Sequence, residues 1–354
     1  NAQFLLFLSA VIKAVDEYQD LLRISVASAG NDHRLGANEA PPAIVSMFIG
    51  DELAEILAAI EEGVAYDKKA AVKMEIGVHV LPSFPKDTTD RNRTSPFAFT
   101  GNKFEFRMLG STFSISGPNI ILNTAVAEEL RQFADELEKA DDFKLALNAL
   151  IRRTIKDHKR IIFNGNNYSD EWVAEAERRG LLNLKSTPDA LPYFVAEKNI
   201  KLFTAHKIFT ESEIHSRYEI LLENYSKTIN IEALTAVEMS KREILPAAMS
   251  FLKDLSKTAL NVKACCPAAT VCAEEKLIEK ISSLTGSLYG ATEKLEAVTA
   301  EAASVSDALA NAQYYRNAVV PAMDEVRTYA DALETVIGEN YWPFPTYGDL
   351  LYGV

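Results

Sequence analysis

The spacing of apolar residues changes along this chain, and that change constrains the fold more than any other feature. Between Val72 and Val80 apolar and polar residues alternate, which is typical of a half-buried strand. A second strand-rich stretch runs from Phe97 to Met108. From Asn119 onward apolar residues recur every three or four positions, which predicts helices. We therefore expect an α+β chain in which the strands precede a long helical region.

Helices are also expected before the strands, over residues 2–22 and 44–62, with Gly50 as a break and Gly63 as a stop. The apolar run at 4–8 lacks a basic leader, and charged residues soon end it, so we expect a buried helix that begins inside a larger protein. After the strands, the predicted helices cover 120–139, 143–157, 170–178, 189–206, 211–261, 273–285, 288–311 and 319–337.

Three local features sharpen these predictions. Asp170 is expected to cap its helix, residues 184–190 to form a loop, and Pro321 to lie near a helix start, where proline is tolerated. The aromatic and proline-rich tail at 341–347 needs a surface to cover its rings. We expect it to dock, with another subunit as one candidate surface.

The charge balance excludes some partners. The 37 basic and 50 acidic residues give a net charge of −13, whereas nucleic-acid-binding proteins usually carry a basic patch. The densest basic run, from Arg152 to Arg160, is interpreted as the solvated face of a helix. We expect neither a nucleic acid nor a membrane as a partner.

The chain has three cysteines, Cys265, Cys266 and Cys272. A small and odd number of cysteines argues against a secreted disulfide framework. No second pair and no histidine follows them, as a zinc site would require. Reduced thiols without a function are the favoured interpretation, and a metal or redox role is the alternative.

The chemistry is concentrated in the segment from Lys103 to Arg107. In a strand, Lys103, Glu105 and Arg107 share one face, and Phe104 and Phe106 share the other. The aromatic face must pack on a core. The charged face either meets solvent or lines a polar cavity, where the carboxylate suits magnesium or manganese and the cations suit phosphates or carboxylates.

Two upstream segments favour the cavity. One is the loop from His33 to Pro42, with the sequence HRLGANEAPP, and the other runs from Asp90 to Pro96, with the sequence DRNRTSP. Together with the charged strand, they supply arginines in three segments, two of which also carry a glutamate. This combination predicts a site for two anionic substrates.

The succession of RLGANEAPP and RNRTSPFAFTGNKFEFR resembles glutamine synthetase, specifically the large type III class. The order of an arginine–glutamate flap, an Asn-Arg segment and a Glu-x-Arg strand is similar to that of the family. By this resemblance, the chain is the C-terminal half of the subunit of an ATP-dependent glutamate–ammonia ligase that forms glutamine through γ-glutamyl phosphate.

The resemblance also implies roles for individual residues. Arg34 would hold the carboxylate of glutamate, Glu39 would close the flap and take a proton from ammonium, Arg93 would face the transferred phosphate, Lys103 would lie near the nucleotide phosphates, Glu105 would bind Mg²⁺ or Mn²⁺, and Arg107 would engage the side-chain carboxyl of glutamate. ATP is then a co-substrate.

The fold implied is the C-terminal part of a catalytic barrel of antiparallel strands, followed by a mostly helical extension. We expect the C-terminal part of the catalytic domain in 1–140, helices that pack on the catalytic domain in 141–260, and a helical bundle extension with the aromatic and proline-rich tail in 261–354. The family implies a cytoplasmic homo-oligomer of rings with shared active sites. Because the family's upstream glutamate and histidine ligands are absent, the isolated chain is expected to be inactive.

Two alternatives remain open. The helical region after Asn119 carries no catalytic motif, so the chain is alternatively a helical assembly module without chemistry of its own. It is also alternatively another ATP-dependent carboxylate–amine ligase of the same superfamily, acting on a different amine or acid.

Overall fold

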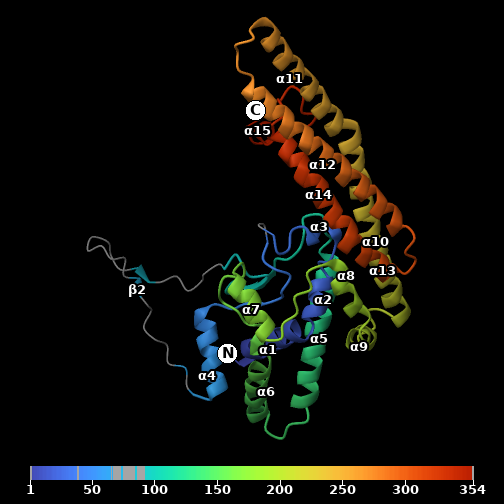
Figure 1. Ribbon diagram of the computed structural model, residues 1–354. Helices are drawn as coiled ribbons and strands as arrows, with labels where there is room; N and C mark the ends of the chain where they lie inside the picture. The colour runs from blue at the N-terminus through green and yellow to red at the C-terminus, as the bar shows by residue number, and fades with distance from the viewer. Residues whose placement is uncertain are drawn as a thin grey trace. The chain divides into compact units, whose positions relative to one another are not determined.

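The computed structural model describes residues 2–37, 40–64, 66, 73–74, 84–85 and 92–352. Within it the chain forms two compact units, Asn1–Leu221 and Leu222–Val354 (Figure 1). The three-part division at residues 140 and 260 stays a prediction.

Unit 1 is mostly helical. Its helices are α1 (Ala2–Glu17), α2 (Gln19–Ile24), α3 (Ala29–Asp32), α4 (Asp51–Glu62), α5 (Ser116–Leu137), α6 (Phe143–His158), the 3-10 turn η1 (Lys159–Ile161), α7 (Asp170–Arg178), α8 (Thr187–Ala190), the 3-10 turn η2 (Leu191–Val195) and α9 (Glu197–Ala205). The expected helix over 2–22 is confirmed, with a break at Tyr18 between α1 and α2.

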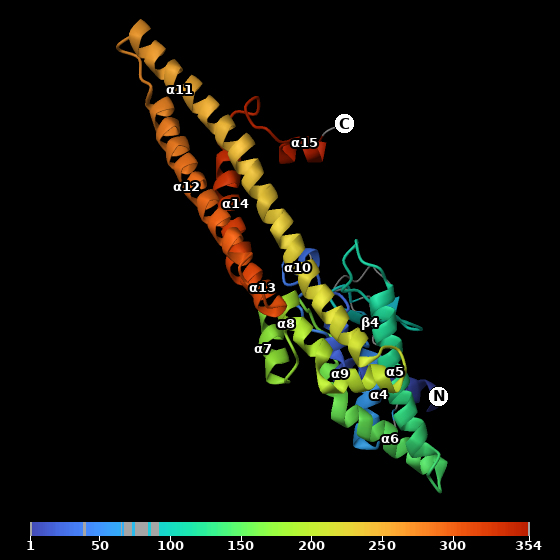
Figure 2. The ribbon, with the colours of Figure 1, turned by 90° about the vertical axis from the view of Figure 1, so that its right-hand side faces the viewer.

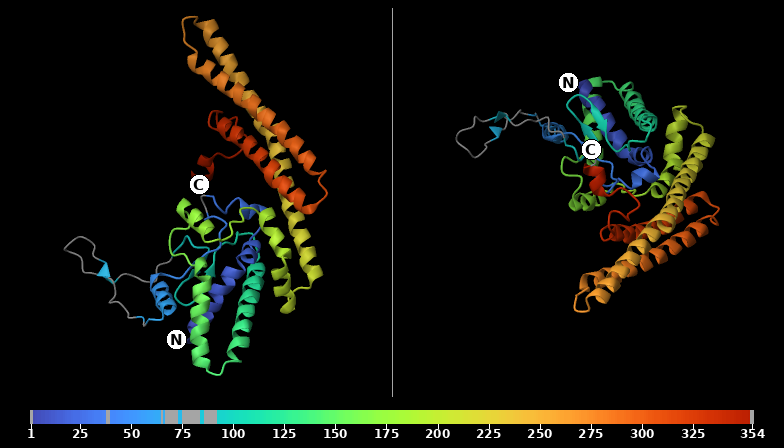
Figure 3. Two further views of the ribbon diagram at one scale, coloured as in Figure 1. Left: turned by 60° about the horizontal axis from the view of Figure 1, so that its bottom comes forward. Right: turned by 90° about the horizontal axis from the view of Figure 1, so that it is seen from above.

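Helix α1 forms the centre of this unit, because it packs between α5 and α6 (Figure 3, left). Ala10 of α1 meets Phe133 of α5 and Leu150 of α6 in a buried apolar cluster. Burial of this apolar surface is the main contribution to the stability of the three-helix layer.

Buried charges also tie α1 to its neighbours. Lys13 Nζ lies 2.5 Å from Glu129 Oε2 of α5, and the Glu129 side chain is fully buried. The carboxylate of Asp16 lies 2.8 Å from His158 Nδ1 and accepts a 2.7 Å hydrogen bond from Arg160 Nε. Each buried acid thus has a cationic or hydrogen-bonding partner, as burial of a carboxylate requires.

The sheet of unit 1 is small and mixed. It has the order β1 (Met47–Phe48), β4 (Phe97–Phe99) and β5 (Phe104–Phe106). β1 is parallel to β4, and β4 is antiparallel to β5. β2 (Lys73–Met74) and β3 (Phe84–Pro85) form a separate antiparallel pair.

The predicted β4–β5 strands are confirmed, but the described residues form an open sheet, so the barrel is not confirmed. Most of the strand predicted at 72–80 lies outside the described residues.

Unit 2 is a helical bundle whose first long helix begins in unit 1. Its elements are α10 (Glu211–Met239), the π turn η3 (Ser240–Ile244), α11 (Leu245–Cys265), α12 (Cys272–Ala302), α13 (Ala308–Tyr314), the π turn η4 (Tyr315–Val319), α14 (Val320–Glu334) and α15 (Tyr347–Tyr352). Helix α12 packs on both α11 and α14 (Figure 2). Ile281, Leu288 and Leu295 of α12 are buried in this bundle.

Both prolines inside long helices of unit 2 follow a π turn. Pro246 comes two residues after Ser240–Ile244, and Pro321 comes two residues after Tyr315–Val319. Proline lacks an N–H and its ring displaces the carbonyl four residues earlier, and a π turn accommodates both effects without ending the helix. The prediction that Pro321 lies near a helix start is confirmed, because Pro321 is the second residue of α14, which follows α13 through the π turn η4.

Three local predictions need correction. Residues 273–302 form one helix, because Gly286 and Gly290 cost only about 1 kcal/mol each in a helix that packing already fixes. Ser169, rather than Asp170, caps α7 by accepting from Trp172 N. Ser186 and Asp189 form a capping box, so part of the expected loop at 184–190 is helix α8.

The tail docks in part within its own unit. The Tyr341 ring lies 5.1 Å from the Phe251 ring, and Tyr341 Oη donates a 3.0 Å hydrogen bond to Asp254 of α11. Leu350 and Leu351 of α15 are exposed. Among the described residues, no helix is long and apolar enough to cross a bilayer.

Candidate active site

The β4–β5 hairpin presents one aromatic and one charged face. Its register pairs Phe97 with Phe106 and Phe99 with Phe104, so all four rings lie on the same face. The Phe97 ring stacks on the Phe104 ring at 5.2 Å, and Phe97 is almost fully buried. Ala98 pairs with Glu105 on the opposite face. The predicted separation of Phe104 and Phe106 from Glu105 is thus confirmed.

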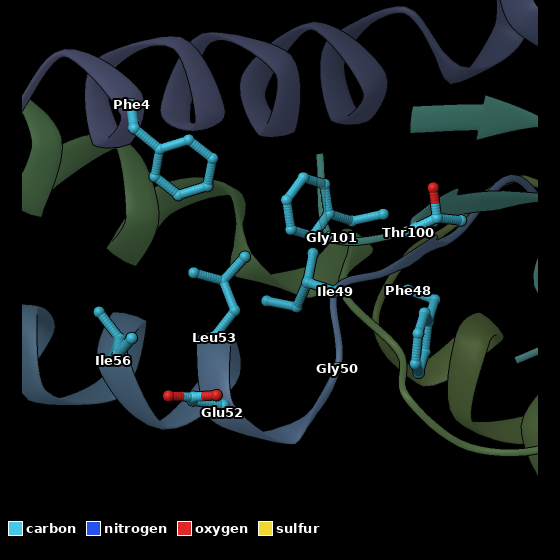
Figure 4. Close-up of a pocket in the computed structure, with 10 residues that line it drawn as sticks. Phe4, Phe48, Ile49, Gly50, Glu52, Leu53, Ile56, Thr100 and Gly101 are labelled. Carbon is cyan, nitrogen blue, oxygen red and sulfur yellow. The ribbon is translucent and has the colours of Figure 1, made fainter. Parts of the chain in front are cut away.

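An apolar cavity of about 280 Å³ lies beside the aromatic face. Figure 4 shows Phe4 of α1 on one side of it, and Leu53 and Ile56 of α4 on the other. Phe99, Thr100 and Gly101 of the hairpin also line the cavity, as do Glu52 of α4 and residues 48–50. Because Phe99 belongs to the aromatic face, the cavity lies on the side of the hairpin opposite to Glu105.

Glu105 lies between two cations on the charged face. Its Oε2 accepts hydrogen bonds from Arg107 Nη2 at 2.8 Å and Nε at 3.2 Å, and its Oε1 lies 3.5 Å from Lys103 Nζ. The hydrogen bond from Arg107, more than the charge of Lys103, holds the pKa of Glu105 below its usual value. The strand thus carries an ionised carboxylate with a cation on each side.

The Asn92–Arg93 segment lies against the end of this charged face, since Arg107 Nη1 donates to the backbone carbonyl of Asn92. The Asn92 side chain accepts from Thr94 N at 2.8 Å and from Ser95 N at 3.2 Å, which forms a tight turn. Arg93 follows directly and its side chain is exposed. The structure therefore places Arg93 next to the residue that Arg107 contacts.

Arg34, in the loop from His33 to Pro42, contacts the chain at the same end of β5. Arg34 Nη2 donates to Leu109 O at 3.0 Å, and the Asn31 side chain donates to Met108 O at 3.0 Å. Gly36, with a φ of +78°, donates from its N–H to Pro41 O at 3.0 Å and so closes the base of the loop. Glu39, the predicted base, lies outside the described residues.

Sequence reasoning missed the loop that supports the Asn92 turn. Asn92 Nδ2 donates to Gly165 O at 2.9 Å. Asn164 Oδ1 accepts from Ile49 N and Gly50 N, and the buried Asn167 side chain donates to Ser46 Oγ at 2.7 Å. The signal was the polar pattern Asn-Gly-Asn-Asn at 164–167, which interrupts the helical periodicity.

A divalent cation is not accommodated by the described residues alone. They contain no group of three or more His, Cys, Asp or Glu side chains arranged to hold a metal ion. Glu105 offers one carboxylate, and that carboxylate is already engaged by Arg107. Hard cations usually need several oxygen ligands, so Glu105 by itself does not make a metal site.

Comparison with known proteins identifies the class. Residues 146–263 match the glutamine synthetase C-terminal domain. The chain is 46% identical over 364 residues to a glutamine synthetase of Butyrivibrio fibrisolvens, covering 100% of the chain and 51% of that protein. It is 41% identical over 360 residues to a type-3 glutamine synthetase of Dictyostelium discoideum, covering 99% of the chain and 49% of that protein.

A glutamine synthetase of Bacteroides fragilis is 35% identical over 363 residues, which cover 99% of the chain and 50% of that protein. The chain thus spans about half the length of the relatives it matches. Along its whole length it is homologous to glutamine synthetases, including one of type III, which confirms the family resemblance of the motifs.

Proposed function

We propose that this chain supplies part of the active site of an ATP-dependent glutamate–ammonia ligase. The observation that carries the proposal is the convergence of Arg34, Arg107 and the Asn92–Arg93 turn at one end of β5. These contacts bring together three segments that are distant in sequence and that each carry an arginine, and a site for anionic substrates needs such cations. The names of the relatives support the same activity.

In this proposal each cation binds a different anionic group of the substrates. Arg107 engages the side-chain carboxyl of glutamate, Arg34 holds the other carboxylate, and Arg93 faces the transferred phosphate. Lys103, which is two-thirds exposed, lies at the other end of the charged face, near the nucleotide phosphates. The Arg107–Glu105 pair is partly exposed, and such pairs contribute about 0–1 kcal/mol, so a substrate carboxylate can compete for Arg107.

The chemistry follows from the poor reactivity of a carboxylate toward amines. A side-chain oxygen of glutamate attacks the γ-phosphorus of ATP, the bond to the leaving oxygen breaks, and ADP departs from an acyl phosphate. Ammonia then attacks the carbonyl carbon, and phosphate leaves. Arginines near the transferred group offset its developing charge. Glu39 accepts the ammonium proton, because only neutral ammonia is a nucleophile.

Glu105 is the residue we assign to Mg²⁺ or Mn²⁺, which would neutralise phosphate charge when bound. Since the described residues do not complete a metal site, other ligands must come from elsewhere in the protein or from a neighbouring subunit. We propose a homo-oligomer of rings with shared active sites for the same reason.

The two alternatives make different predictions in one assay. The protein that contains this chain is incubated with ATP, glutamate and ammonia, and glutamine and ADP are measured, with each substrate omitted in turn. The proposal predicts glutamine only with all three substrates. ADP release that depends on another acid or amine would favour a different ligase of the superfamily. No ADP release with any acid–amine pair would favour a helical assembly module, which the bundle of α11, α12 and α14 also suits.

The isolated 354-residue chain is expected to be inactive in this assay.

A further inference from the structure

A second cavity of unit 1 is not explained by the ligase chemistry. It has a volume of about 560 Å³, which is within the usual range of small-molecule sites, and it is lined by residues of α4, the end of α6 and α7. Its apolar lining includes the side chains of Leu57, Ile155 and Ile162. The cations of the charged β5 face do not line it.

The edge of this cavity carries more basic than acidic side chains. Five cations line it, against the acids Glu61, Asp157 and Glu175; the cations are Lys156, Lys159, Arg160, Arg178 and Arg179. The basic run that the sequence placed on a solvated helix face thus forms one wall of a concave site. Concave surfaces of one sign attract counter-ions more strongly than flat ones.

Another cavity lies against the same two helices, α4 and α6, and the two cavities together are called the groove. It has a volume of about 860 Å³, shares Lys156 and Asp157 with the first, and adds Arg152 and Arg153. Seven cations line the two cavities against three acids, and two further acids, Glu136 and Asp16, pair with Arg153 and Arg160. Cations therefore still outnumber acids here, although the net charge of the whole chain is −13.

The ion pairs at the edge leave several cations able to turn toward a ligand. Lys159 Nζ lies 2.7 Å from Glu61, and Arg178 Nη2 lies 2.5 Å from Glu175, but both cationic side chains are more than half exposed. Exposed pairs of this kind contribute little to stability. Arg179 is held more firmly, because it donates to Glu175 at 2.7 Å and to Ile162 O at 2.8 Å.

We propose that this groove, lined by the apolar side chains of α4 and α6 and the cations of α6 and α7, binds a small organic anion. The ligand class is an apolar ring system that carries two or more negative charges, with the ring against Leu57 and Ile155 and the charges toward Lys156, Lys159 and Arg178. The site goes beyond the proposed ligase activity, and its occupancy is measurable without turnover.

The test is binding of pyranine, a fluorescent hydroxypyrene trisulfonate, followed by fluorescence anisotropy. The groove variant carries Lys156→Ala, Lys159→Ala and Arg178→Ala. The matched control carries Lys201→Ala, Lys227→Ala and Arg242→Ala, which removes the same charge from exposed positions outside the groove. Loss of three charge contacts is expected to weaken binding at least about tenfold in the groove variant, and the control is expected to keep the affinity within about twofold.

Thermal melts of both variants check that folding is retained. Competition with uridine monophosphate and with phthalate then distinguishes phosphate from carboxylate as the favoured anionic group, and displacement by either supports the site. The proposal is overturned if the wild-type protein does not bind pyranine, if neither competitor displaces it, or if the groove variant and the control bind with equal affinity.

Discussion

Arg107 donates two hydrogen bonds to the Glu105 carboxylate, at 2.8 and 3.2 Å, while its remaining terminal nitrogen donates to the backbone carbonyl of Asn92. The guanidinium thus joins β5 to the turn that carries Arg93. Only a planar group with several donors can make these contacts at once. The position of this single cation therefore links two of the three segments of the proposed active site.

Arg107→Lys should selectively impair glutamate binding. Lysine retains the charge but cannot bond Glu105 and Asn92 together, so the cation loses its fixed position. We expect the KM for glutamate to rise by about ten- to a hundredfold, which corresponds to about 1–3 kcal/mol of charge-assisted hydrogen bonding. The KM for ATP should change only a few-fold. Arg131→Lys, on an exposed part of α5, is the matched control. An unchanged KM for glutamate would remove Arg107 from the substrate site.

The two faces of the hairpin should respond differently to truncation. Phe97 is 1% exposed and contacts both Phe104 and Phe106, so Phe97→Ala should lower the free energy of unfolding by about 3–5 kcal/mol. Phe104 is only partly buried, and its truncation should cost less. Glu105→Ala should cost under about 1 kcal/mol, because its ion pairs are partly exposed. Denaturant titrations measure all three, and an equal loss for Phe97→Ala and Glu105→Ala would contradict the assignment of the faces.

The sequence predicted best those features that depend on the spacing of apolar residues within a few positions. The alternation from Lys103 to Arg107 predicted the correct faces of β5, and the helical spacing of apolar residues predicted the bounds of α7. Local signals failed where packing outweighs them. Gly286 does not break α12, because burial of Leu288 and Leu295 offsets the weak helix propensity of one glycine.

The arrangement of the candidate site was predictable only in part. The motifs identified Arg34, Arg93 and Arg107, but no sequence period indicates that Arg34 bonds Leu109 O or that Gly165 O holds Asn92. These contacts join residues more than 70 positions apart. They depend on how the helices pack, which composition and spacing do not specify.

The stability of unit 1 should fall as pH rises from about 4.5 to about 7, the range set by the pKa of Glu129. Burial of the Glu129 carboxyl raises its pKa from 4.5 to about 7, against the opposing effect of Lys13. Between these values the folded state holds a proton that the unfolded state has released, so the contribution of Glu129 is greatest near pH 4.5 and declines toward pH 7.

Glu129→Gln should flatten that dependence, because a neutral side chain does not titrate. The wild-type slope from this group should approach about −1.4 kcal/mol per pH unit at its steepest. The measurement is the free energy of unfolding across this range in urea, with Glu136→Gln on the exposed side of α5 as control. A variant with the wild-type slope would show that Glu129 is not the titrating group.

Glu39→Gln tests the proposed base. If Glu39 takes the ammonium proton, its loss should slow glutamine formation by about 10²–10⁴-fold and leave the KM for ATP and for glutamate within a few-fold. Hydroxylamine, unlike ammonia, is already mostly neutral and therefore nucleophilic near neutral pH. It does not need a base to deprotonate it first, so it should restore much of the rate. Equal slowing with ammonia and hydroxylamine would argue against a base, and an unchanged rate with both would make Glu39 an ordinary loop residue.

The most direct test follows oxygen from the substrate. Glutamate whose side-chain carboxylate carries the heavy isotope of oxygen is incubated with ATP, ammonia and the protein that contains this chain, and the phosphate released is analysed by mass spectrometry. If an acyl phosphate forms, its C–O bond breaks when ammonia attacks, so each glutamine formed should leave one heavy oxygen atom in phosphate. The same experiment with Arg107→Lys should show this transfer at a reduced rate. Absence of glutamine, or glutamine formed with unlabelled phosphate, would contradict the proposal that this site activates glutamate by phosphorylation.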